Sequence, residues 1–252
     1  METYGVGFFS RLIDIIYPPR CSICRKFILE GSAESGAEHP HFCRECIGDF
    51  RACSSPLCPV CGRPFESASG EDHFCEECLR KRPFYKASAS PYLYEGGIMS
   101  AIHQFKYGQK SFLAKSLGPL LAAFARTRIG GQEDLLTMPV PLHPKRLRER
   151  GFNQSLLLAG YVARHINSRL DCFTLKRVRY TLSQTGLKRE ERRRNVRGAF
   201  QVEDANTVRN RVILLVDDVT TTGNTLNECA KVLVKAGSRE VLCLTLARTV
   251  NW

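Results

Sequence analysis

The residues best suited to chemistry lie between Arg211 and Thr225, a stretch that reads RVILLVDDVTTTGNT. Five apolar residues, rich in β-branched side chains, lead directly into Asp217 and Asp218, and helical spacing of apolar residues resumes after Gly223. The stretch therefore predicts a buried strand, a loop and a helix, with both carboxylates at the carboxyl end of the strand. Ligands of open parallel sheets bind at that end, where free amides of a helix N-terminus accept an anion.

Two acids beside an anion site need an explanation of their own, because carboxylates repel phosphate. Asp217 and Asp218 are suited instead to accept hydrogen bonds from sugar hydroxyls, or to face a magnesium ion that bridges to the phosphate. A double acid at a sheet edge is costly unless a ligand or water satisfies it. A phosphate loop next to acceptors for a polyol indicates a phosphorylated sugar as the ligand.

This pattern resembles the phosphoribosyl pyrophosphate (PRPP) loop of type I phosphoribosyltransferases. The resemblance implies that Asp217 and Asp218 hold the 2′ and 3′ hydroxyls of the ribose, and that Mg²⁺ accompanies PRPP. Purine-salvage members carry an aspartate at the position of Thr221, so this loop lacks their general base. Thr220 departs from the pattern, because many members have an apolar residue there. The residues implied in PRPP binding are Val219, Thr220, Thr221, Thr222, Gly223, Asn224 and Thr225.

A second chemistry is carried by cysteines, eight of which form four CxxC pairs within the first third of the chain. The two-residue spacing lets both thiolates of a pair face one tetrahedral ion, and two pairs complete a structural zinc site. On the sequence alone, cross-braced pairing and an iron–sulfur cluster stay open as alternatives. In simple chain order, the two predicted zinc sites are Cys21, Cys24, Cys43 and Cys46, and Cys58, Cys61, Cys75 and Cys78.

Charge is distributed unevenly along the chain. Residues 1–90 carry 11 Lys and Arg against 12 Asp and Glu, whereas residues 91–252 carry 26 against 13. Most of the excess falls in residues 143–197, with 15 basic and 4 acidic side chains. This concentration predicts an anionic partner with several charges, either pyrophosphate or a nucleic-acid backbone.

Two basic segments are candidates to bind that anion. The first is expected as a loop between a strand at residues 135–140 and a helix capped by Asn153, on the same rim of the sheet as the acids. The second, at residues 181–197, has little apolar periodicity and is expected to be a mobile loop that closes over the ligand. The candidate pyrophosphate ligands are Lys145, Arg146, Arg148, Arg150, Gln184, Arg189, Arg192, Arg193 and Arg197.

Two further motifs, RGFNQ at residues 150–154 and QTGLKREERRRNVRGAF at residues 184–200, are similar to segments of the ComF/GntX family. That family is associated with natural competence and the use of external DNA. The resemblance covers nearly the whole chain and implies two domains. Residues 1–86 would hold an N-terminal amphipathic helix and a double zinc ribbon. Residues 87–252 would form an α/β domain of the type I phosphoribosyltransferase kind, a parallel sheet flanked by helices.

Two functions from different classes stay open. In the first, the protein is an enzyme that transfers phosphoribosyl from PRPP to an unidentified acceptor, with Mg²⁺ and with release of pyrophosphate. In the second, it is a non-catalytic, PRPP-responsive adaptor of the DNA-uptake machinery. The adaptor would bind single-stranded DNA on its basic rim and dock a partner such as a competence helicase or another uptake protein.

Composition bears on where such a protein would work. No apolar stretch approaches the roughly 18 to 20 residues of a membrane span. The N-terminus lacks a basic leader, and Arg11 and Asp14 interrupt its apolar residues. We therefore expect a cytoplasmic protein, in a reducing compartment where cysteines bind metal rather than form disulfides.

Overall fold

The computed structural model describes residues 18–28, 39–66, 70–129, 134–181 and 194–250. The predicted N-terminal amphipathic helix lies outside these ranges, as does most of the basic segment at residues 181–197. Among the helices of the described ranges, none combines the length and the apolar character that a membrane span requires.

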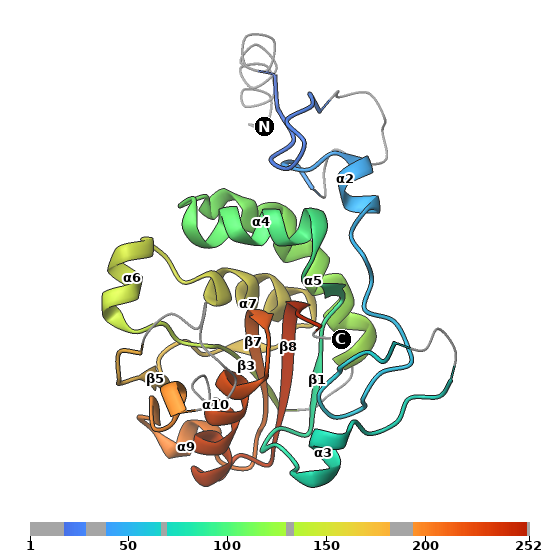
Figure 1. Cartoon of the computed structure of the whole chain (residues 1–252). Coiled ribbons are helices and arrows are strands. Elements are labelled where there is room, and N and C mark those ends of the chain that lie inside the picture. Colours follow the sequence, from blue (N-terminus) through green and yellow to red (C-terminus); the bar gives the residue numbers. More distant parts are fainter. Residues whose placement is uncertain (1–17, 29–38, 67–69, 130–133, 182–193, 251–252) are drawn as a thin grey trace.

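A parallel sheet forms the centre of the molecule, in the order β1-β8-β7-β3-β4. The short strand β2 also pairs with β8, nearer to the carboxyl end of β8 than β1 does. Figure 1 shows its two longest strands, β7 and β8, side by side. This arrangement confirms the predicted α/β class with a parallel sheet. The strands are β1 (Ala87–Ala89), β2 (Tyr92–Leu93), β3 (Leu135–Pro139), β4 (Arg169–Leu170), β7 (Val212–Thr220) and β8 (Glu240–Arg248).

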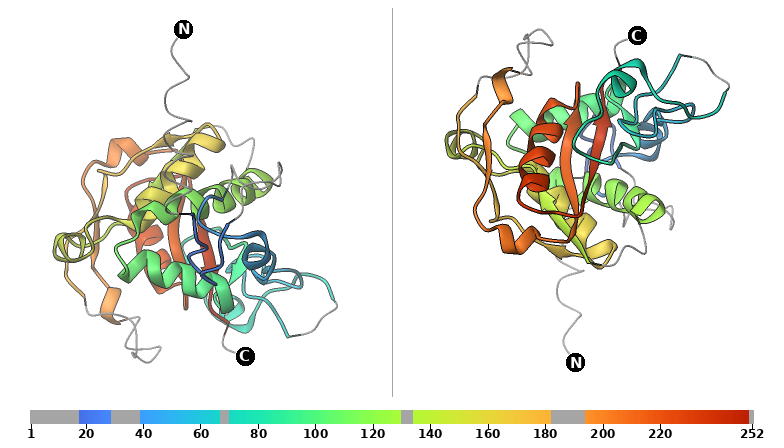
Figure 2. Two further views of the ribbon diagram at one scale, coloured as in Figure 1. Left: turned by 90° about the horizontal axis from the view of Figure 1, so that it is seen from above. Right: turned by 90° about the horizontal axis from the view of Figure 1, so that it is seen from below.

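Helices cover both faces of the sheet, which explains the continuous apolar run of β7. Leu214 and Val216 pack into the cluster formed with α4 (Gly96–Tyr107), α5 (Ala114–Ile129) and α7 (Gln154–His165). Ile213 and Leu215 join the opposite cluster, formed with α10 (Asn224–Lys235). Figure 2 shows the two helical layers from above and below.

The inward face of α10 differs in one position from the periodic pattern of its sequence. Leu226, Ala230 and Leu233 are buried as the spacing predicts, but Val234 is 39% exposed. Cys229 is fully buried and takes its place on the inner face. The helix ends at Lys235, and Gly237, whose φ of +95° suits a glycine after the last helical turn, follows its cap.

A break separates α4 from α5, since α4 ends at Tyr107 and a 3₁₀ turn, η1 (Ser111–Leu113), follows. The basic stretch after β3 was predicted to be a loop, and that prediction is wrong: it forms the helix α6 (Pro144–Arg150). Pro144 suits the first helical turn, and the Nδ1 atom of His143 accepts a hydrogen bond from the amide of Lys145 at 3.2 Å. Gly151, with a φ of +78°, ends the helix.

Three smaller elements complete the α/β domain. An antiparallel pair, β5 (Leu175–Arg177) and β6 (Phe200–Val202), lies outside the main sheet, and β6 leads into the short helix α9 (Ala205–Val208). Strand β6 contacts α10. The pair therefore stands next to α10, and Arg177 of β5 lines the same cavity as the first residues of that helix.

The cysteine-rich region packs directly against this domain. Its first module, with α2 (Arg44–Gly48), is joined to α4 and α5: Gln104 Nε2 donates to the carbonyl oxygen of Ser22 at 2.8 Å, and the amide of His41 donates to Ser116 Oγ at 3.1 Å. Its second module, with α3 (Glu76–Arg80), is joined to the sheet edge, where the amide of Ser88 donates to Val60 O at 2.7 Å.

Candidate functional site

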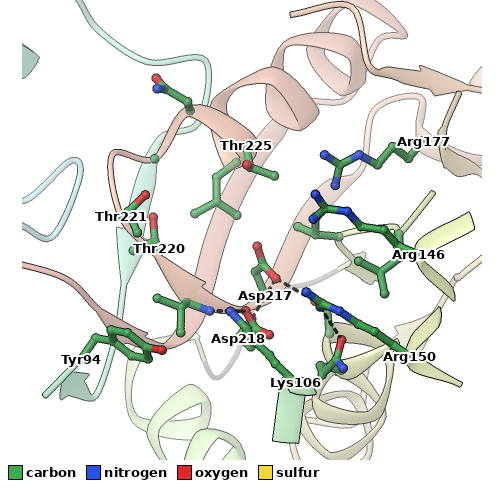
Figure 3. Close-up of a pocket in the computed structure, with 18 of the residues that line it drawn as sticks. Tyr94, Lys106, Arg146, Arg150, Arg177, Asp217, Asp218, Thr220, Thr221 and Thr225 are labelled. Carbon is green, nitrogen blue, oxygen red and sulfur yellow. Dashed lines mark hydrogen bonds and ion pairs between the residues drawn. The ribbon is translucent and has the colours of Figure 1, made fainter. Parts of the chain in front are cut away.

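A cavity of about 620 Å³ opens at the carboxyl ends of β3 and β7, the edge at which the sequence predicts a ligand (Figure 3). Five elements wall the cavity besides β7 and the loop that follows it: α4, α6, α7, α10 and β5. The cavity therefore brings together parts of the chain that are far apart in the sequence.

The paired acids line this cavity from the last part of β7, near the carboxyl end of the strand as predicted. The ladder between β7 and β8 continues to Thr220, which pairs with Arg248. Asp217 is partly buried and Asp218 is 5% exposed. Both carboxylates are therefore presented to the cavity by residues whose backbone belongs to the sheet.

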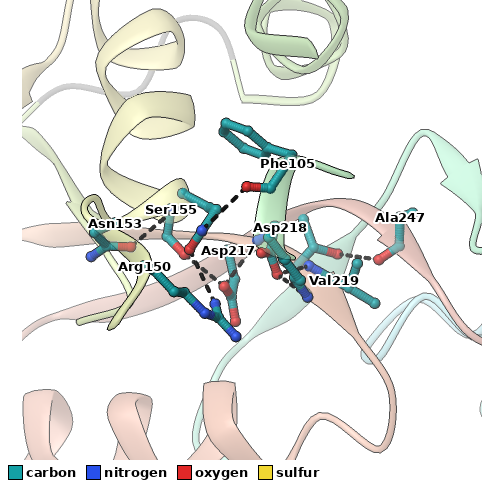
Figure 4. Close-up of polar contacts among 11 residues, drawn as sticks. Phe105, Arg150, Asn153, Ser155, Asp217, Asp218, Val219 and Ala247 are labelled. Carbon is teal, nitrogen blue, oxygen red and sulfur yellow. Dashed lines mark hydrogen bonds and ion pairs between the residues drawn. The ribbon is translucent and has the colours of Figure 1, made fainter. Parts of the chain in front are cut away.

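Each carboxylate has partners within the protein (Figure 4). Oδ1 of Asp217 accepts hydrogen bonds from Ser155 Oγ at 2.7 Å and from the amide of Asp218 at 2.9 Å. Oδ1 of Asp218 lies 2.8 Å from Lys106 Nζ and accepts a hydrogen bond from the amide of Val219 at 2.6 Å. The sequence predicted sugar hydroxyls or Mg²⁺ as the partners of these acids, and did not foresee the ion pair with Lys106.

These surroundings shift the pKa values of Asp217 and Lys106. Burial, and then the charge of Asp218, raise the pKa of Asp217 to about 6, although Lys106 and Ser155 oppose the change. Burial lowers the pKa of Lys106, but the adjacent Asp218 outweighs burial and leaves that pKa above its usual value. Lys106 is therefore a permanent cation in the cavity, and Asp217 changes charge near pH 6.

The loop between β7 and α10 has the character of an anion site. Oγ1 of Thr222 is buried and has no hydrogen-bond partner among the described residues. Within the same ranges, the amides of Thr221, Thr222 and Gly223 donate no hydrogen bond. Gly223 adopts a φ of +72° directly before the twelve-residue helix α10. Unbonded amides and an orphan hydroxyl at a helix N-terminus fit a phosphate group.

Helix α6 directs two of the four cations of the first basic segment into the cavity. Arg146 and Arg150 are four residues apart, hence on one helix face, and both line the cavity. Arg150 Nη1 donates to Gln154 Oε1 at 3.1 Å, and Arg146 Nη2 donates to the carbonyl oxygen of Thr181 at 3.0 Å. The other two predicted ligands of this segment, Lys145 and Arg148, do not line the cavity.

The second basic segment contributes less to the described site. Gln184, Arg189, Arg192 and Arg193 lie outside the described residues. Arg197 is exposed and does not line the cavity, and its carbonyl oxygen accepts a hydrogen bond from Arg179 Nη2 at 2.6 Å. Their proposed contact with pyrophosphate stays a prediction.

Sequence reasoning missed two cations of the cavity, Lys106 and Arg177. Arg177 reaches it from β5, is 9% exposed, and has an Nε atom without a partner among the described residues. Its guanidinium lies 5.2 Å from the ring centroid of Phe200, and burial lowers its pKa. The only available signal was its position within an otherwise strand-like segment, and no local signal singled out Lys106.

The eight cysteines of the CxxC pairs form two separate clusters of four in simple chain order, which confirms the sequential pairing. In each cluster the sulfur atoms all lie within 4.8 Å of one another. Burial raises the pKa of Cys21 and Cys58, but hydrogen bonds from backbone amides outweigh it and lower both to about 7. Four converging thiols with amide donors suit a closed tetrahedral zinc site. One set is Cys21, Cys24, Cys43 and Cys46, and the other is Cys58, Cys61, Cys75 and Cys78.

Comparison with known proteins agrees with this architecture. Residues 12–84 match the double zinc ribbon domain, and residues 153–250 match the phosphoribosyl transferase domain. The chain is 34% identical over 236 residues to the DNA utilization protein YhgH of Escherichia coli O6:H1, across 92% of this chain and 98% of that protein.

Two competence proteins are also similar. Identity to competence protein F of Haemophilus influenzae is 30% over 220 residues, across 82% of this chain and 96% of that protein. Identity to competence protein ComFC of Bacillus subtilis is 25% over 211 residues, across 82% of this chain and 84% of that protein. With two four-cysteine zinc-binding sites joined to a phosphoribosyltransferase domain, the chain belongs to the ComF/GntX family.

Proposed function

We propose that the chain binds PRPP in the cavity and transfers its phosphoribosyl group to an acceptor, with release of pyrophosphate. The observation that carries this proposal is the order of polar groups across the cavity. The loop with unbonded amides lies on one side of Asp217 and Asp218, and Arg146 and Arg177 lie on the other (Figure 3). PRPP presents its groups in the same order: a monophosphate, a sugar diol and a diphosphate.

Each part of the cavity then has a role in positioning or in electrostatics. Residues 221–225 would hold the 5′-phosphate, with the orphan hydroxyl of Thr222 as one donor. Asp217 and Asp218 would each accept a hydrogen bond from the ribose diol through their second carboxylate oxygens. The arginines stabilise charge on pyrophosphate as it departs, the step in which its bond to the anomeric carbon breaks. When bound with PRPP, Mg²⁺ would supply further neutralisation of the diphosphate.

The binding proposal is tested by titration calorimetry of PRPP with Mg²⁺ against wild type and Asp217→Asn/Asp218→Asn. We expect binding by the wild type and no measurable binding by the double variant, because both acceptors for the diol lose their charge. A matched control, Glu71→Gln/Glu203→Gln, removes two exposed acids far from the cavity and should bind like the wild type. Equal affinity of the wild type and the site variant would overturn the proposal.

Catalysis has its own test, the release of pyrophosphate in the presence of candidate acceptors. Amines, nucleobases and nucleic acid are the classes to compare, because the loop lacks the base-directed aspartate of the purine-salvage enzymes. Turnover on any acceptor supports the transferase. Binding of PRPP with no turnover on any of these acceptors favours a PRPP-responsive adaptor.

A specific observation favours that second function, binding of single-stranded DNA. Tyr107 is 53% exposed and Tyr180 is 38% exposed, and both line a hollow of about 270 Å³ adjoining the cavity. The Arg150 guanidinium lies 5.2 Å from the Tyr107 ring centroid, and Lys145 Nζ lies 4.8 Å from that of Tyr180. Aromatic faces among cations are the surfaces on which unpaired bases stack.

The adaptor is tested by retention of a single-stranded oligonucleotide as salt is raised. Tyr107→Ala/Tyr180→Ala should bind about 30-fold more weakly or worse, since each of the two stacked bases contributes about 1 to 3 kcal/mol. Phe173→Ala is the control, because Phe173 is 74% exposed beside Lys176 but lines neither hollow. Either function is expected in the cytoplasm, where thiols stay reduced and free to bind zinc.

A further inference from the structure

We infer that Lys106 is a ligand-binding residue of the cavity, a built-in cation beside Asp218 that contacts the diphosphate of PRPP and takes over part of the role of Mg²⁺. The inference deepens the proposed function and rests on it. It assigns a binding role to α4, which lies outside the segment that matches the phosphoribosyl transferase domain.

The first argument is the position of Lys106. Its side chain is 17% exposed and lines both the main cavity and the adjoining hollow. Of its three N–H donors, the ion pair with Asp218 Oδ1 uses one, and no other acceptor is found among the described residues. An ammonium at the wall of an anion site with two unassigned donors fits an oxygen of the ligand (Figure 3).

The second argument is competition for the acid. Oδ1 of Asp218 already receives Lys106 Nζ at 2.8 Å and the amide of Val219 at 2.6 Å. A magnesium ion that approached this oxygen would have to compete with both donors, and Mg²⁺ also gives up its own water reluctantly. Lys106 therefore already supplies a positive charge beside Asp218 at the wall of the cavity.

The third argument concerns the alternative, that the pair only anchors α4 to β7. Helix α4 is already held by Ile98, Ile102 and Phe105, which are fully buried, and by the hydrogen bond from Gln104 to the first zinc module. Buried ion pairs contribute little net stability, and apolar residues of similar volume often replace them without loss. A charged pair exposed to the cavity is better explained by what binds there.

The experiment measures PRPP affinity of wild type, Lys106→Met and Lys106→Arg by calorimetry, with Mg²⁺ and in magnesium-free buffer. A chelator is avoided because it would also remove zinc. We expect the affinity of the wild type for PRPP to fall less than about tenfold when Mg²⁺ is left out. The affinity of Lys106→Met should fall about 10- to 100-fold more than that of the wild type, which is the range for a lost charge-assisted hydrogen bond. Lys106→Arg should restore most of the difference. Lys115→Met, which removes an exposed cation outside the cavity, should behave like the wild type.

A second comparison separates direct contact from an effect through Asp218. In the Asp218→Asn background, Lys106→Met leaves no unpaired carboxylate, and thermal unfolding and zinc content check that it folds. A further loss of affinity in this background supports contact with PRPP, whereas no further loss means that Lys106 acts only by holding Asp218 and overturns the inference. Equal magnesium dependence of wild type and Lys106→Met also overturns it. Failure of the wild type to bind PRPP even with Mg²⁺ would instead overturn the proposed function.

Discussion

Gln104 Nε2 donates a hydrogen bond of 2.8 Å to the carbonyl oxygen of Ser22, and so ties the first zinc site to the helix that carries Lys106. Ser22 lies inside the first CxxC pair, between Cys21 and Cys24. Gln104 is two residues before Lys106, near the end of α4. The local geometry of a metal site is thus linked by one side chain to a wall of the cavity.

Replacing Gln104 should weaken PRPP binding without loss of zinc. In Gln104→Met, the carbonyl oxygen of Ser22 loses its donor and the end of α4 loses an anchor, so we expect about three- to tenfold weaker binding, the equivalent of one hydrogen bond. Calorimetry measures the affinity and a colorimetric chelator assay measures the zinc. In the control, Lys110→Met, the other partner of Gln104 at 2.6 Å is removed but the bond to Ser22 remains, and affinity should be unchanged. Unchanged affinity in Gln104→Met would show that the hydrogen bond between Gln104 and Ser22 does not influence the cavity.

Asp217 should make the protein less stable as the pH rises. Its pKa is raised to about 6 in the folded chain, from an ordinary value of 3.8, so it favours folding when protonated. That contribution is complete below the unfolded pKa and is lost as pH rises through the folded pKa. Between pH 5 and pH 8 we expect a loss on the order of 1 kcal/mol in the free energy of unfolding from this group. Denaturant unfolding at several pH values should show the loss in wild type and not in Asp217→Asn.

Ser155→Ala provides a second check on the same group. The Ser155 hydroxyl donates to Asp217 Oδ1 and so lowers the pKa of Asp217. Without this hydrogen bond the pKa of Asp217 should rise further. The pH range over which Ser155→Ala loses stability should therefore lie higher than that of the wild type, and Ser155→Ala/Asp217→Asn should show no such loss. An unmoved transition would mean that another group is responsible.

The two cysteine clusters should bind zinc independently. Cys21→Ser removes one ligand of the first site and should reduce the zinc content from about two ions per chain to about one, because each site is complete in itself. Cys53→Ser is the matched control, since Cys53 is buried but belongs to neither cluster. Loss of both ions in Cys21→Ser would show that the second site depends on the first.

Gly62 should not tolerate a side chain. Its φ is +71°, and a Cβ atom there would lie 2.4 Å from the backbone oxygen of Ser88 in the edge strand β1. We expect Gly62→Ala to lower the free energy of unfolding by about 2 kcal/mol or more, from backbone strain and overpacking together. Gly48→Ala should change it little, because no atom lies within 4 Å of the added carbon. Equal stability of the two variants would show that the second zinc module can shift away from β1.

The features that the sequence predicts correctly are those written in local patterns. The apolar run of β7, the helical spacing after Gly223 and the cap at Asn153 each depend on neighbouring residues. The CxxC spacing belongs to the same class, and zinc pairing in chain order follows because each module closes on itself. The fold and half of the cavity could therefore be anticipated.

The missed features depend on contacts between distant segments or on competing local signals. Lys106 meets Asp218 only because α4 crosses the carboxyl edge of the sheet, and nothing near Lys106 in the sequence indicates this. Helix α6 was missed although Pro144 and Gly151 are ordinary helix boundaries, because the run of charges between them resembles a solvated loop. Recognising that helix would have separated Arg146 and Arg150 from the outward-facing cations.

The position of β1 and β3 on either side of the two central strands decides how this protein can be divided for study. A fragment limited to residues 153–250 would keep β7 and β8 but expose the outer backbone edge of each, a template for intermolecular strand pairing and aggregation. The same fragment would also lack Lys106, Arg146 and Arg150. Excised from the rest of the chain, the phosphoribosyltransferase segment would be an aggregation-prone piece with an incomplete pocket, so ligand measurements belong on the intact polypeptide.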